Sequence, residues 1–531
     1  MSKKAIFSAT LILAASSLLS RVLGVVRDHL FASRFGALQG GGIFDLDAYY
    51  AAFRIPDLLF QILIIGAVSA AFVPIFSGYL HKNQKEKAWK FLDTTLTGIG
   101  LLMLIVSTLT LIAAPFLIPL LVPGFSPEKI KLTTQLTQIM LVSPIFFGLS
   151  SIFQGVENSA KKYAYFALAP IAYNLSIIIG TLFFSQQYGV YAIAISVAIG
   201  AVLHAATQLP AIYQLGYRYQ PNFHFRSPDI KQFILLAIPR IFSTGVNQFN
   251  LVINTLIAST FVTGSIASFN FAYNMQSVVL GIIGISTAII AFGIFAQQMA
   301  TGDHDGMRTT LSEKIEQIIL FTLPATLGLI VLRTEIVTTL LGAGQFTQQD
   351  ITLTANLLAI FALSLLAQNL MPLLSRYFFA QQNTRTPVKI SITGLTVDTL
   401  LSLYLGITLH YQITGVVTAF SIACYVQLFL YLHRIRSDFT TTGSAELSLG
   451  GPLLHLKKQL QIIIASIIML LSVLLTKATL ETMLIPGRLR SIIILVGCSI
   501  IGYLIYLFTL KLLKYPKYHQ LWKIRGDRAE N

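Results

Sequence analysis

Residues 88–122 read AWKFLDTTLTGIGLLMLIVSTLTLIAAPFLIPLLV, and this stretch decides the class of fold. Between Asp93 and Val122 it carries no charged residue, and it exceeds the roughly 20 apolar residues that a membrane-spanning helix needs. It lacks the ten-residue alternation that marks the strands of a membrane barrel. The stretch therefore predicts a transmembrane helix, and similar runs recur along the chain.

The composition of the whole chain agrees with this interpretation. Of its 531 residues, 55% are hydrophobic and 11% charged, whereas soluble domains carry about 25% charged residues. A soluble globule has too little interior for so much apolar sequence, and disordered chains are poor in it. The formal charge of +16 is scattered between apolar runs, so we expect membrane lipids rather than nucleic acid as the partner. Cys424 and Cys498 lie in apolar runs and form neither a disulfide framework nor a metal site.

Apolar runs separated by polar residues predict an all-α polytopic membrane protein with about fourteen transmembrane helices. The first run continues through Arg21 to Asp28 without a small-residue cleavage site, so we interpret it as a retained helix. The expected spans are 6–33, 46–80, 88–122, 129–157, 162–184, 188–215, 229–262, 266–299, 309–333, 350–381, 387–409, 413–436, 456–478 and 489–513.

The basic residues predict the orientation. With fourteen spans both termini lie on one side, and that side receives 25 of the 37 lysines and arginines, against seven on the other. Because cytoplasmic loops carry an excess of basic residues, we expect both termini to be cytoplasmic.

A weak internal repeat predicts the domain organisation. Residues 125–127 (FSP) match residues 346–348 (FTQ), and two further pairs of short segments match at nearly the same separation in sequence. We therefore expect two six-helix lobes related by an axis along the membrane normal, an arrangement typical of transporters. The predicted regions are an N-lobe at 1–222, a C-lobe at 223–440, and a region at 441–531 with spans 13 and 14 and a basic cytoplasmic tail.

Five arginines fall inside the expected spans: Arg21, Arg27, Arg54, Arg240 and Arg376. A charge there costs at least a few kcal/mol unless it has a partner or lines a water-filled cavity. Arg376, and in part Arg240, fit an alternative in which the side chain extends to the headgroups. Arg21 and Arg27 lie within about 60° of each other on a helical wheel, and we expect them to face a shared cavity with Arg54. Guanidinium groups bind phosphate through paired hydrogen bonds, so the predicted ligand is an anion.

Carboxylates accompany the arginines and also occur alone in the second half. Asp28 and Asp47 either neutralise the arginines or exchange partners when substrate enters. Asp398 is either a neutral residue hydrogen-bonded in the core or a ligand of a cation. Asn254 and Thr418 could supply further oxygens, and a sodium ion is the cation that we expect; no other cofactor is predicted.

Signals of an enzyme are missing. The sequence has no glycine-rich phosphate loop, no nucleophile elbow and no soluble domain that could hold one. The histidines are scattered without the spacing of metal ligands. We therefore expect a transporter driven by an ion gradient, the membrane potential or the substrate gradient.

Residues 20–76 closely resemble the MurJ/MviN family, the lipid II flippases of the multidrug/oligosaccharidyl-lipid/polysaccharide exporter superfamily. The resemblance rests on SRVLGVVRD at 20–28, FGA at 35–37, DAYYAAFRIPDLL at 47–59 and GAVSAAFVP at 66–74. Weaker likeness continues in PGF at 123–125, INT at 253–255, GDHD at 302–305 and NTRTPV at 383–388.

The resemblance implies a monomeric fourteen-span protein of the bacterial inner membrane, with no enzymatic activity. It implies export of the undecaprenyl-pyrophosphate-linked peptidoglycan precursor lipid II from the inner to the outer leaflet, by alternating access between two lobes. The family's cavity charges match Arg21, Arg27, Asp28, Asp47 and Arg54. Family members with a sodium site draw its oxygens from spans 7, 11 and 12, which here makes Asn254, Asp398 and Thr418 the candidates.

Several family charges are replaced in this sequence, and Arg240 in span 7 is the candidate to replace one of them. The cargo could therefore be lipid II or another polyprenyl-linked glycan. A drug exporter would favour an acidic cavity, a glycan-transferring enzyme would need a large external loop, and a scaffold without transport would look alike in sequence. The replaced positions are Phe60, Gln61, Ile65, Asn274 and Ser277.

Overall fold

The computed structural model describes residues 3–38, 40–65, 68–441 and 456–516, which are helical and contain no β-strand. The predicted basic tail beyond residue 516 lies outside them. The first half holds α1 (Lys3–Phe35), α2 (Leu46–Phe60), α3 (Val73–His81), α4 (Lys85–Leu121), α5 (Pro127–Met140), α6 (Ser143–Ala160), α7 (Tyr163–Tyr188), α8 (Val190–Ala206), α9 (Leu209–Gln214) and α10 (Pro228–Ser259). The second half holds α11 (Ser265–Val279), α12 (Ser286–Ala300), α13 (His304–Val331), α14 (Arg333–Leu341), α15 (Gln348–Ala380), α16 (Arg385–Ser402), α17 (Gln412–Thr441), α18 (Leu456–Met483) and α19 (Arg488–Leu512).

Eleven helical segments of the described chain are long and apolar enough to cross a membrane. The all-helical, multi-pass class is thereby confirmed. The three other expected spans fall on α1, on the interrupted segment from α2 to α3, and on α10, each of which includes side chains outside the described residues. The total of fourteen therefore stays a prediction.

Local sequence signals set several helix ends. Ser126 and Ser227 accept hydrogen bonds from backbone N–H groups three residues on, and a proline follows each of them at the first helical position. Both features favour a helix start, because the side-chain oxygen satisfies a free N–H and proline lacks one. Asp45 caps α2 in the same way through Ala48. At the other end of α7, Gly189 has φ +53°, a conformation that glycine adopts without strain.

The chain forms two compact units. The first comprises Met1–Ala267 with Ala343–Asp350, and the second comprises Ser268–Gly342 with Ile351–Asn531. The short segment at 343–350 belongs to the first unit because Gln345 N donates to Ser33 O at 2.9 Å and Asp350 accepts from Leu38 N at 2.7 Å. The lobe limits expected at residues 222 and 440 stay predictions.

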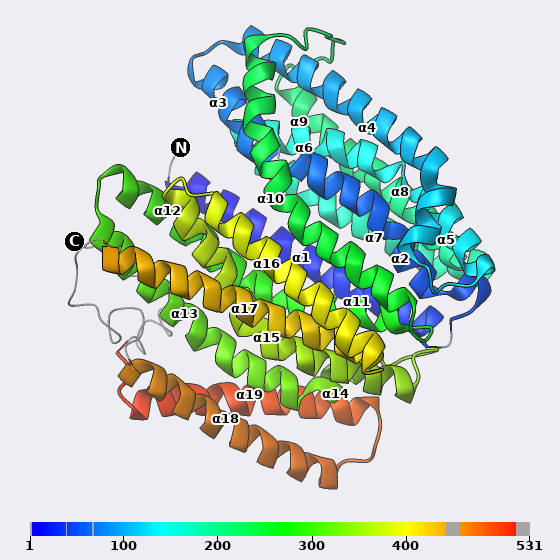
Figure 1. The fold of residues 1–531 in the computed structure, drawn as a ribbon, viewed down its shortest axis with the longest axis vertical. Helices are drawn as coiled ribbons and strands as arrows, with labels where there is room; N and C mark the ends of the chain where they lie inside the picture. Colours follow the sequence, from blue (N-terminus) through cyan, green and yellow to red (C-terminus); the bar gives the residue numbers. More distant parts are fainter. Residues whose placement is uncertain (1–2, 39, 66–67, 442–455, 517–531) are drawn as a thin grey trace. The chain divides into compact units, whose positions relative to one another are not determined.

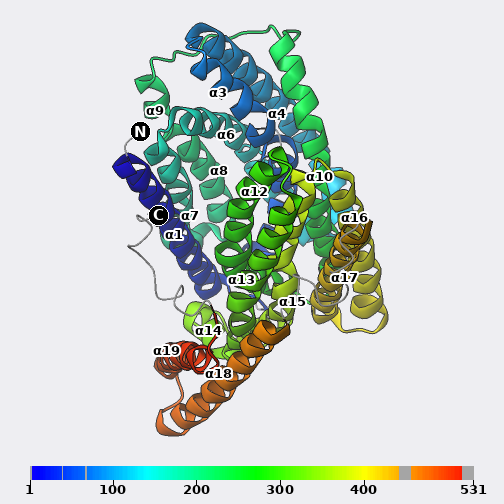
Figure 2. The same ribbon diagram turned by 90° about the vertical axis from the view of Figure 1, so that its left-hand side faces the viewer.

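Aromatic packing builds the core of the first unit at one end of α4 and α6. The Phe72 ring stacks on Phe76 and Phe91 at centroid distances of 5.2 and 5.5 Å. Phe153 and Val156 of α6 are buried in the same cluster. Elsewhere in this unit α7 packs along α1 and α8 (Figure 2). The first helix is thereby held by its contact with α7.

Three expected spans contain irregular π-helical turns, and in two of them the turns lie at corresponding places. In the span from 46 to 80 these turns are Gln61–Ile65 and Val68–Phe72, and in the span from 266 to 299 the turn is Leu280–Ile285. The turn Leu403–Thr408, in the span from 387 to 409, stands apart from this pair. The separation between Gln61–Ile65 and Leu280–Ile285 is close to the offset of the sequence repeat. Short π-helical turns are rare and often lie at functional sites, so this shared irregularity supports a duplicated architecture.

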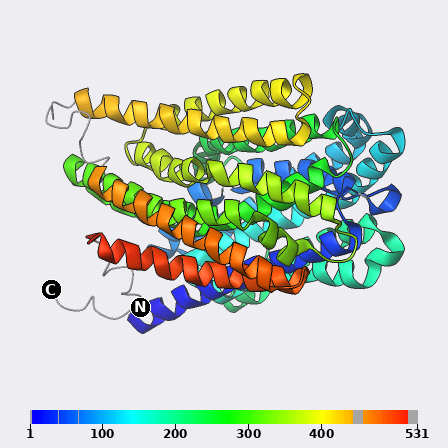
Figure 3. The same cartoon turned by 90° about the horizontal axis from the view of Figure 1, so that it is seen from below.

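In the second unit, α16 and α17 lie side by side (Figure 1), as do α18 and α19 (Figure 3). α18 also packs on α13. Ion pairs join Lys458 to Glu316 at 3.1 Å and Lys477 to Glu335 at 2.9 Å, so α18 is held near both of its ends. The two last spans, which the repeat leaves out, are therefore an integral part of this unit.

Candidate substrate-binding site

Arg27 and Asp28 form an ion pair on α1. The guanidinium donates from Nε and Nη2 to Asp28 Oδ1 at 3.1 and 2.9 Å, and it lies 5.8 Å from the centre of the Phe31 ring. Its Nη1 donates a longer bond of 3.4 Å to Asn174 Oδ1 on α7. The Arg27 side chain keeps 24% of its surface exposed. The charge of Arg27 is thus neutralised by its neighbour, while the side chain keeps part of its surface exposed.

Arg54 and Arg21 occupy the neighbouring helices α2 and α1. Arg54 is half-buried, and its Nε donates to Thr255 Oγ1 on α10 at 3.0 Å. Arg21 is half-buried and makes no hydrogen bond or ion pair within the described part of the chain. All three predicted arginines therefore belong to the first unit, and each keeps part of its surface exposed.

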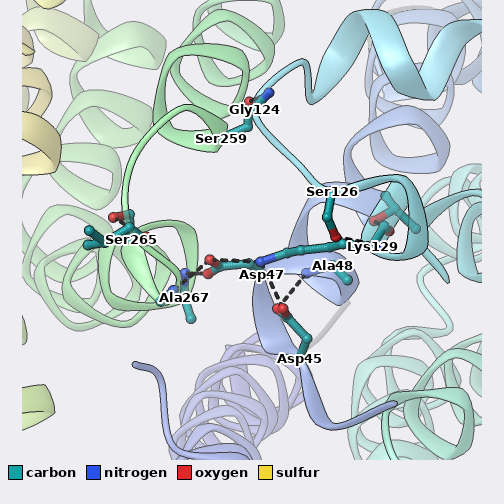
Figure 4. Close-up of polar contacts among 12 residues, drawn as sticks. Asp45, Asp47, Ala48, Gly124, Ser126, Lys129, Ser259, Ser265 and Ala267 are labelled. Atoms are coloured by element: carbon teal, nitrogen blue, oxygen red, sulfur yellow. Dashed lines mark hydrogen bonds and ion pairs between the residues drawn. The ribbon is translucent and has the colours of Figure 1, made fainter. Parts of the chain in front are cut away.

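Asp47 has a different environment from the arginines (Figure 4). Its Oδ1 accepts from Ala267 N at 2.7 Å, and its Oδ2 accepts from Gly264 N at 2.6 Å and lies 3.5 Å from Lys129 Nζ. Lys129 also pairs with Asp45 at 2.8 Å. Asp47 is 2% exposed, and its carboxylate is surrounded by hydrogen-bond donors of the protein itself. It thereby links the start of α2 to Gly264, which directly precedes α11, and to Ala267 in the first turn of α11.

Sequence reasoning missed two partners of these residues. Lys129 is the first residue of the span expected at 129–157 and was not a candidate site residue, although it lies between Asp45 and Asp47, with its ammonium 4.1 Å from the centre of the Phe125 ring. Asn174 gave no signal, because an asparagine in an apolar span has many possible roles. No spacing rule connects residues 82 or 147 positions apart.

Arg240 and Arg376 complete the set of intramembrane arginines. Arg240 lies in α10, but its side chain is outside the described residues, so its role as a replacement charge stays a prediction. In the second unit, Arg376 Nη1 donates to the carbonyl of Ile285, the last residue of the π-helical turn, at 3.3 Å. Its contact is thus with backbone of a neighbouring helix.

Each of the predicted sodium ligands has a hydrogen bond within its own helix. In α16, Asp398 is 1% exposed and accepts from Ser402 Oγ at 3.3 Å. Thr418 Oγ1 donates to the carbonyl of Thr414, and Asn254 Nδ2 donates to Asn250 Oδ1 at 3.1 Å. Within the described ranges no three His, Cys, Asp or Glu side chains gather as metal ligands. Asn254 belongs to the first unit and the other two to the second. The sodium assignment stays a prediction.

The positions where family charges are replaced make local contacts where the structure describes them, and the side chain of Ile65 lies outside the described residues. Phe60 packs on Phe147 with ring centres 5.1 Å apart. Gln61 Nε2 donates to Asp57 Oδ1 at 3.4 Å. Ser277 Oγ donates to the carbonyl of Asn274. None of these three side chains restores a charge at its position.

A multi-pass helical chain with π-helical turns in its spans and arginines on its first helices has the features of a membrane transporter. A transporter described as a multidrug resistance MATE family member of the MOP superfamily, inward-facing, has the same fold. Its TM-score is 0.67 at 14% identity, covering 82% of this chain and 100% of that one. The narrower assignment is to the MurJ family: the chain belongs to it, matching the family described as lipid II flippase MurJ over residues 36–495.

Relatives and a solved structure agree with this assignment. A probable lipid II flippase MurJ from Rickettsia prowazekii (strain Madrid E) is 31% identical over 426 residues, 80% of this chain and 82% of that protein. A lipid II flippase MurJ from Burkholderia cenocepacia is 29% identical, covering 80% of this chain and 83% of that one. The structure titled "Lipid II flippase MurJ, inward closed conformation" is 26% identical, with a TM-score of 0.78 over 96% of this chain and 99% of that chain. The similarity therefore extends over nearly the whole protein.

Proposed function

We propose that this protein is a lipid II flippase, which moves the undecaprenyl-pyrophosphate-linked peptidoglycan precursor from the inner to the outer leaflet of the bacterial inner membrane. Membership of the MurJ family supports the cargo. The observation that carries the chemistry is the partly exposed side chain of Arg27, whose guanidinium is held by Asp28 on the same helix. A pyrophosphate is the part of lipid II that this group would recognise.

Substrate recognition proceeds by exchange of partners at Arg27. Asp28 neutralises the guanidinium through one carboxylate oxygen while no substrate is present. Pyrophosphate offers several oxygens and more negative charge, and it takes over the paired donors of the guanidinium, whose planar fork suits phosphate. Asp28 lowers the free-energy cost of holding the positive charge of Arg27 in the membrane. A ligand must displace the Asp28 carboxylate from Arg27, so only an anion with a high negative charge binds there.

Arg21 and Arg54 supply the remaining positive charge for the diphosphate. Arg21 has no internal partner in the described chain, so its donors are available without breaking a bond. Arg54 gives up or shares its bond to Thr255. Asp47 is a positioning residue in this proposal, because its oxygens are already used by Gly264, Ala267 and Lys129.

The transport cycle is alternating access by a monomer with both termini in the cytoplasm, and no chemical step occurs. The bias of basic residues supports this orientation. A sodium ion bound by Asp398, with oxygens of Asn254 and Thr418, assists the return of the empty carrier. Burial of the Asp398 carboxylate supports this role, since a cation would offset its charge.

Two experiments test the proposal. The protein should restore outer-leaflet lipid II in a bacterium depleted of its own flippase. In a binding assay with purified protein, Arg27→Gln should weaken lipid II binding by about tenfold to a hundredfold, because a hydrogen bond to a charged group contributes about 1.5–3 kcal/mol and about 1.4 kcal/mol corresponds to a factor of ten. Arg27→Lys should restore binding only in part, since ammonium keeps the charge without the planar fork.

The matched control is Arg434→Gln, which removes an exposed arginine from the end of α17. It should bind lipid II like the wild type. Equal losses in Arg27→Gln and Arg434→Gln would mean that net charge alone attracts the lipid. Normal binding by Arg27→Gln would contradict the assignment of the pyrophosphate to this arginine.

A further inference from the structure

Glu157, in the last turn of α6, is a buried carboxyl group without a partner. Glu157 is 0% exposed, and neither of its carboxyl oxygens has a hydrogen-bond donor or an ion pair within the described part of the chain. Every other buried aspartate or glutamate described in the protein has at least one such interaction: Asp28, Asp45, Asp47, Asp93, Glu316, Glu335, Asp350 and Asp398. Glu157 is therefore an exception that the transport site does not explain.

An ionised carboxylate in this position would be costly. Transfer of an unpaired charge out of water costs several kcal/mol per ion even after the protein relaxes. The C-terminal end of a helix adds to this cost, because it carries a partial negative charge. A buried acid in such surroundings becomes neutral by binding a proton.

The ionisable groups of the helices packed against α6 leave this carboxyl without a counter-ion. Several have other partners: Asp93 accepts from Tyr217, Tyr79 donates to Asp229, and His204 is bonded to Ser150. None of the described ionisable side chains on the helices in contact with α6 bonds to the Glu157 carboxyl. These side chains are Asp47, Tyr49, Tyr50, Arg54 and Asp57 on α2, Tyr79 and His81 on α3, Lys85, Glu86, Lys87, Lys90 and Asp93 on α4, Tyr165, Tyr173 and Tyr188 on α7, Tyr191 and His204 on α8, and Tyr213 on α9.

The helix that carries Glu157 also packs against irregular backbone. Gly155 lies so close to the Phe72 ring that an added Cβ would be 2.6 Å from it, and Phe72 is the last residue of the π-helical turn Val68–Phe72. Short π-helical turns are rare and often lie at functional sites. Gly155 and Glu157 lie about 200° apart around the helix, so this contact holds α6 on the face opposite the buried carboxyl.

Two exposed basic residues lie just beyond this turn. The helix ends at Ala160, the next residue Lys161 has φ +60°, and Lys162 N donates to the carbonyl of Glu157 at 2.8 Å. Both lysine side chains are exposed. Unwinding of this single turn would expose the carboxyl beside two ammonium groups, which stabilise its ionised form.

We propose that Glu157 is a proton-binding site of the transport cycle, which holds one proton in the conformation described here and releases it to water beside Lys161 and Lys162 when the last turn of α6 unwinds. The coupling rests on the proposed transport function, whereas the bound proton does not. The ligand is H⁺ itself, and a proton gradient is the energy source that such a site would use.

The bound proton is tested by infrared difference spectroscopy of the purified protein in lipid at about neutral pH. The wild type minus Glu157→Gln should show the carbonyl stretch of a protonated carboxylic acid. Glu86→Gln, which removes an exposed acid from the first turn of α4, should leave that band unchanged. Absence of the band from the Glu157 difference spectrum would overturn the proposal.

Stability provides a second readout that does not depend on transport. Glu157→Met replaces an unpartnered polar group by an apolar side chain of similar length, so its Tm should equal or exceed that of the wild type. A clear fall in Tm would mean that the carboxyl has a bond in solution, and would contradict the site. Glu157→Gln keeps the shape of the neutral acid and should fold normally.

Coupling is tested in proteoliposomes with lipid II at several pH values. One bound proton predicts a rate that changes by up to about tenfold per pH unit, and Glu157→Gln should abolish this dependence while Glu86→Gln retains it. An unchanged pH profile in Glu157→Gln would overturn the coupling. If the wild type moves no lipid II at all while the infrared band is present, the transport function fails and the proton site stands.

Discussion

Replacement of Asp47 by alanine removes the acceptor of two buried backbone N–H groups, those of Gly264 and Ala267. Each bond to a charged acceptor contributes about 1.5–3 kcal/mol, and loss of the acceptor also leaves the donors unsatisfied. Two such bonds give an expected destabilisation of about 3–6 kcal/mol. The ion pair with Lys129 at 3.5 Å is lost as well.

Asp47→Asn is the intermediate variant. The amide keeps one oxygen for one of the two N–H groups but places an NH₂ donor against the other. We therefore expect Asp47→Asn to be less stable than the wild type and more stable than Asp47→Ala. Asp303→Ala is the control, because Asp303 is an exposed cap that accepts a single bond from Gly306 N at 2.8 Å, and loss of such a cap typically costs about 1 kcal/mol.

Thermal unfolding in detergent and lipid II binding together decide the role of Asp47. Asp47→Ala should lower the Tm at least twice as much as Asp303→Ala. Its affinity for lipid II, measured per folded molecule well below the Tm, should change by less than about twofold, against the tenfold or greater loss expected for Arg27→Gln. A variant with normal Tm and weakened binding would refute the positioning role and restore Asp47 to the substrate site.

Three further predictions concern topology, the last two spans and the cation. Cysteines replacing Gln84 and Gln187 should react with impermeant reagents from opposite sides of the membrane; reaction from one side would refute the fourteen-span topology. Lys477→Met leaves Glu335 buried without its partner and should cost about 3–5 kcal/mol, whereas Lys477→Met with Glu335→Gln should recover most of the lost Tm; no recovery would mean that the ion pair is not the cause. Asp398→Asn should weaken any sodium dependence of transport while lipid II binding stays intact, and transport indifferent to both would leave Asp398 a core residue.

The helices were predictable because a membrane imposes one dominant rule on sequence. A span must be apolar for about 20 residues, so the expected limits 350–381 and 489–513 differ by only a few residues from α15 and α19. The span expected at 129–157 is two helices, α5 and α6, with a break near Leu141. Hydropathy does not detect this break, since the residues at it, Met140, Leu141 and Val142, are themselves apolar.

The arginines were predictable as functional candidates, but the partners of charged residues were not. A charge inside an apolar run is conspicuous in sequence, which is why Arg27 and Arg54 were found. Asp47 looked like another member of the same set because sequence gives only its type and position. The carboxylate oxygens of Asp47 accept from the backbone N–H groups of Gly264 and Ala267. Every residue except proline has such a group. No sequence pattern distinguishes the two that Asp47 binds.

Glu157 shows the opposite error, in which a residue of ordinary appearance has unusual surroundings. It lies at the last position of an expected span and is followed by Lys161 and Lys162, so its sequence context indicates an acid at the membrane surface with basic neighbours. Its carboxyl is nevertheless fully buried and has no hydrogen-bond donor in the described part of the chain. Sequence shows neither the burial nor the missing donor, so it does not distinguish a hydrated surface charge from a site that must bind a proton. The infrared difference between the wild type and Glu157→Gln distinguishes them, because only a protonated carboxylic acid gives the carbonyl band, and a hydrated carboxylate would give none.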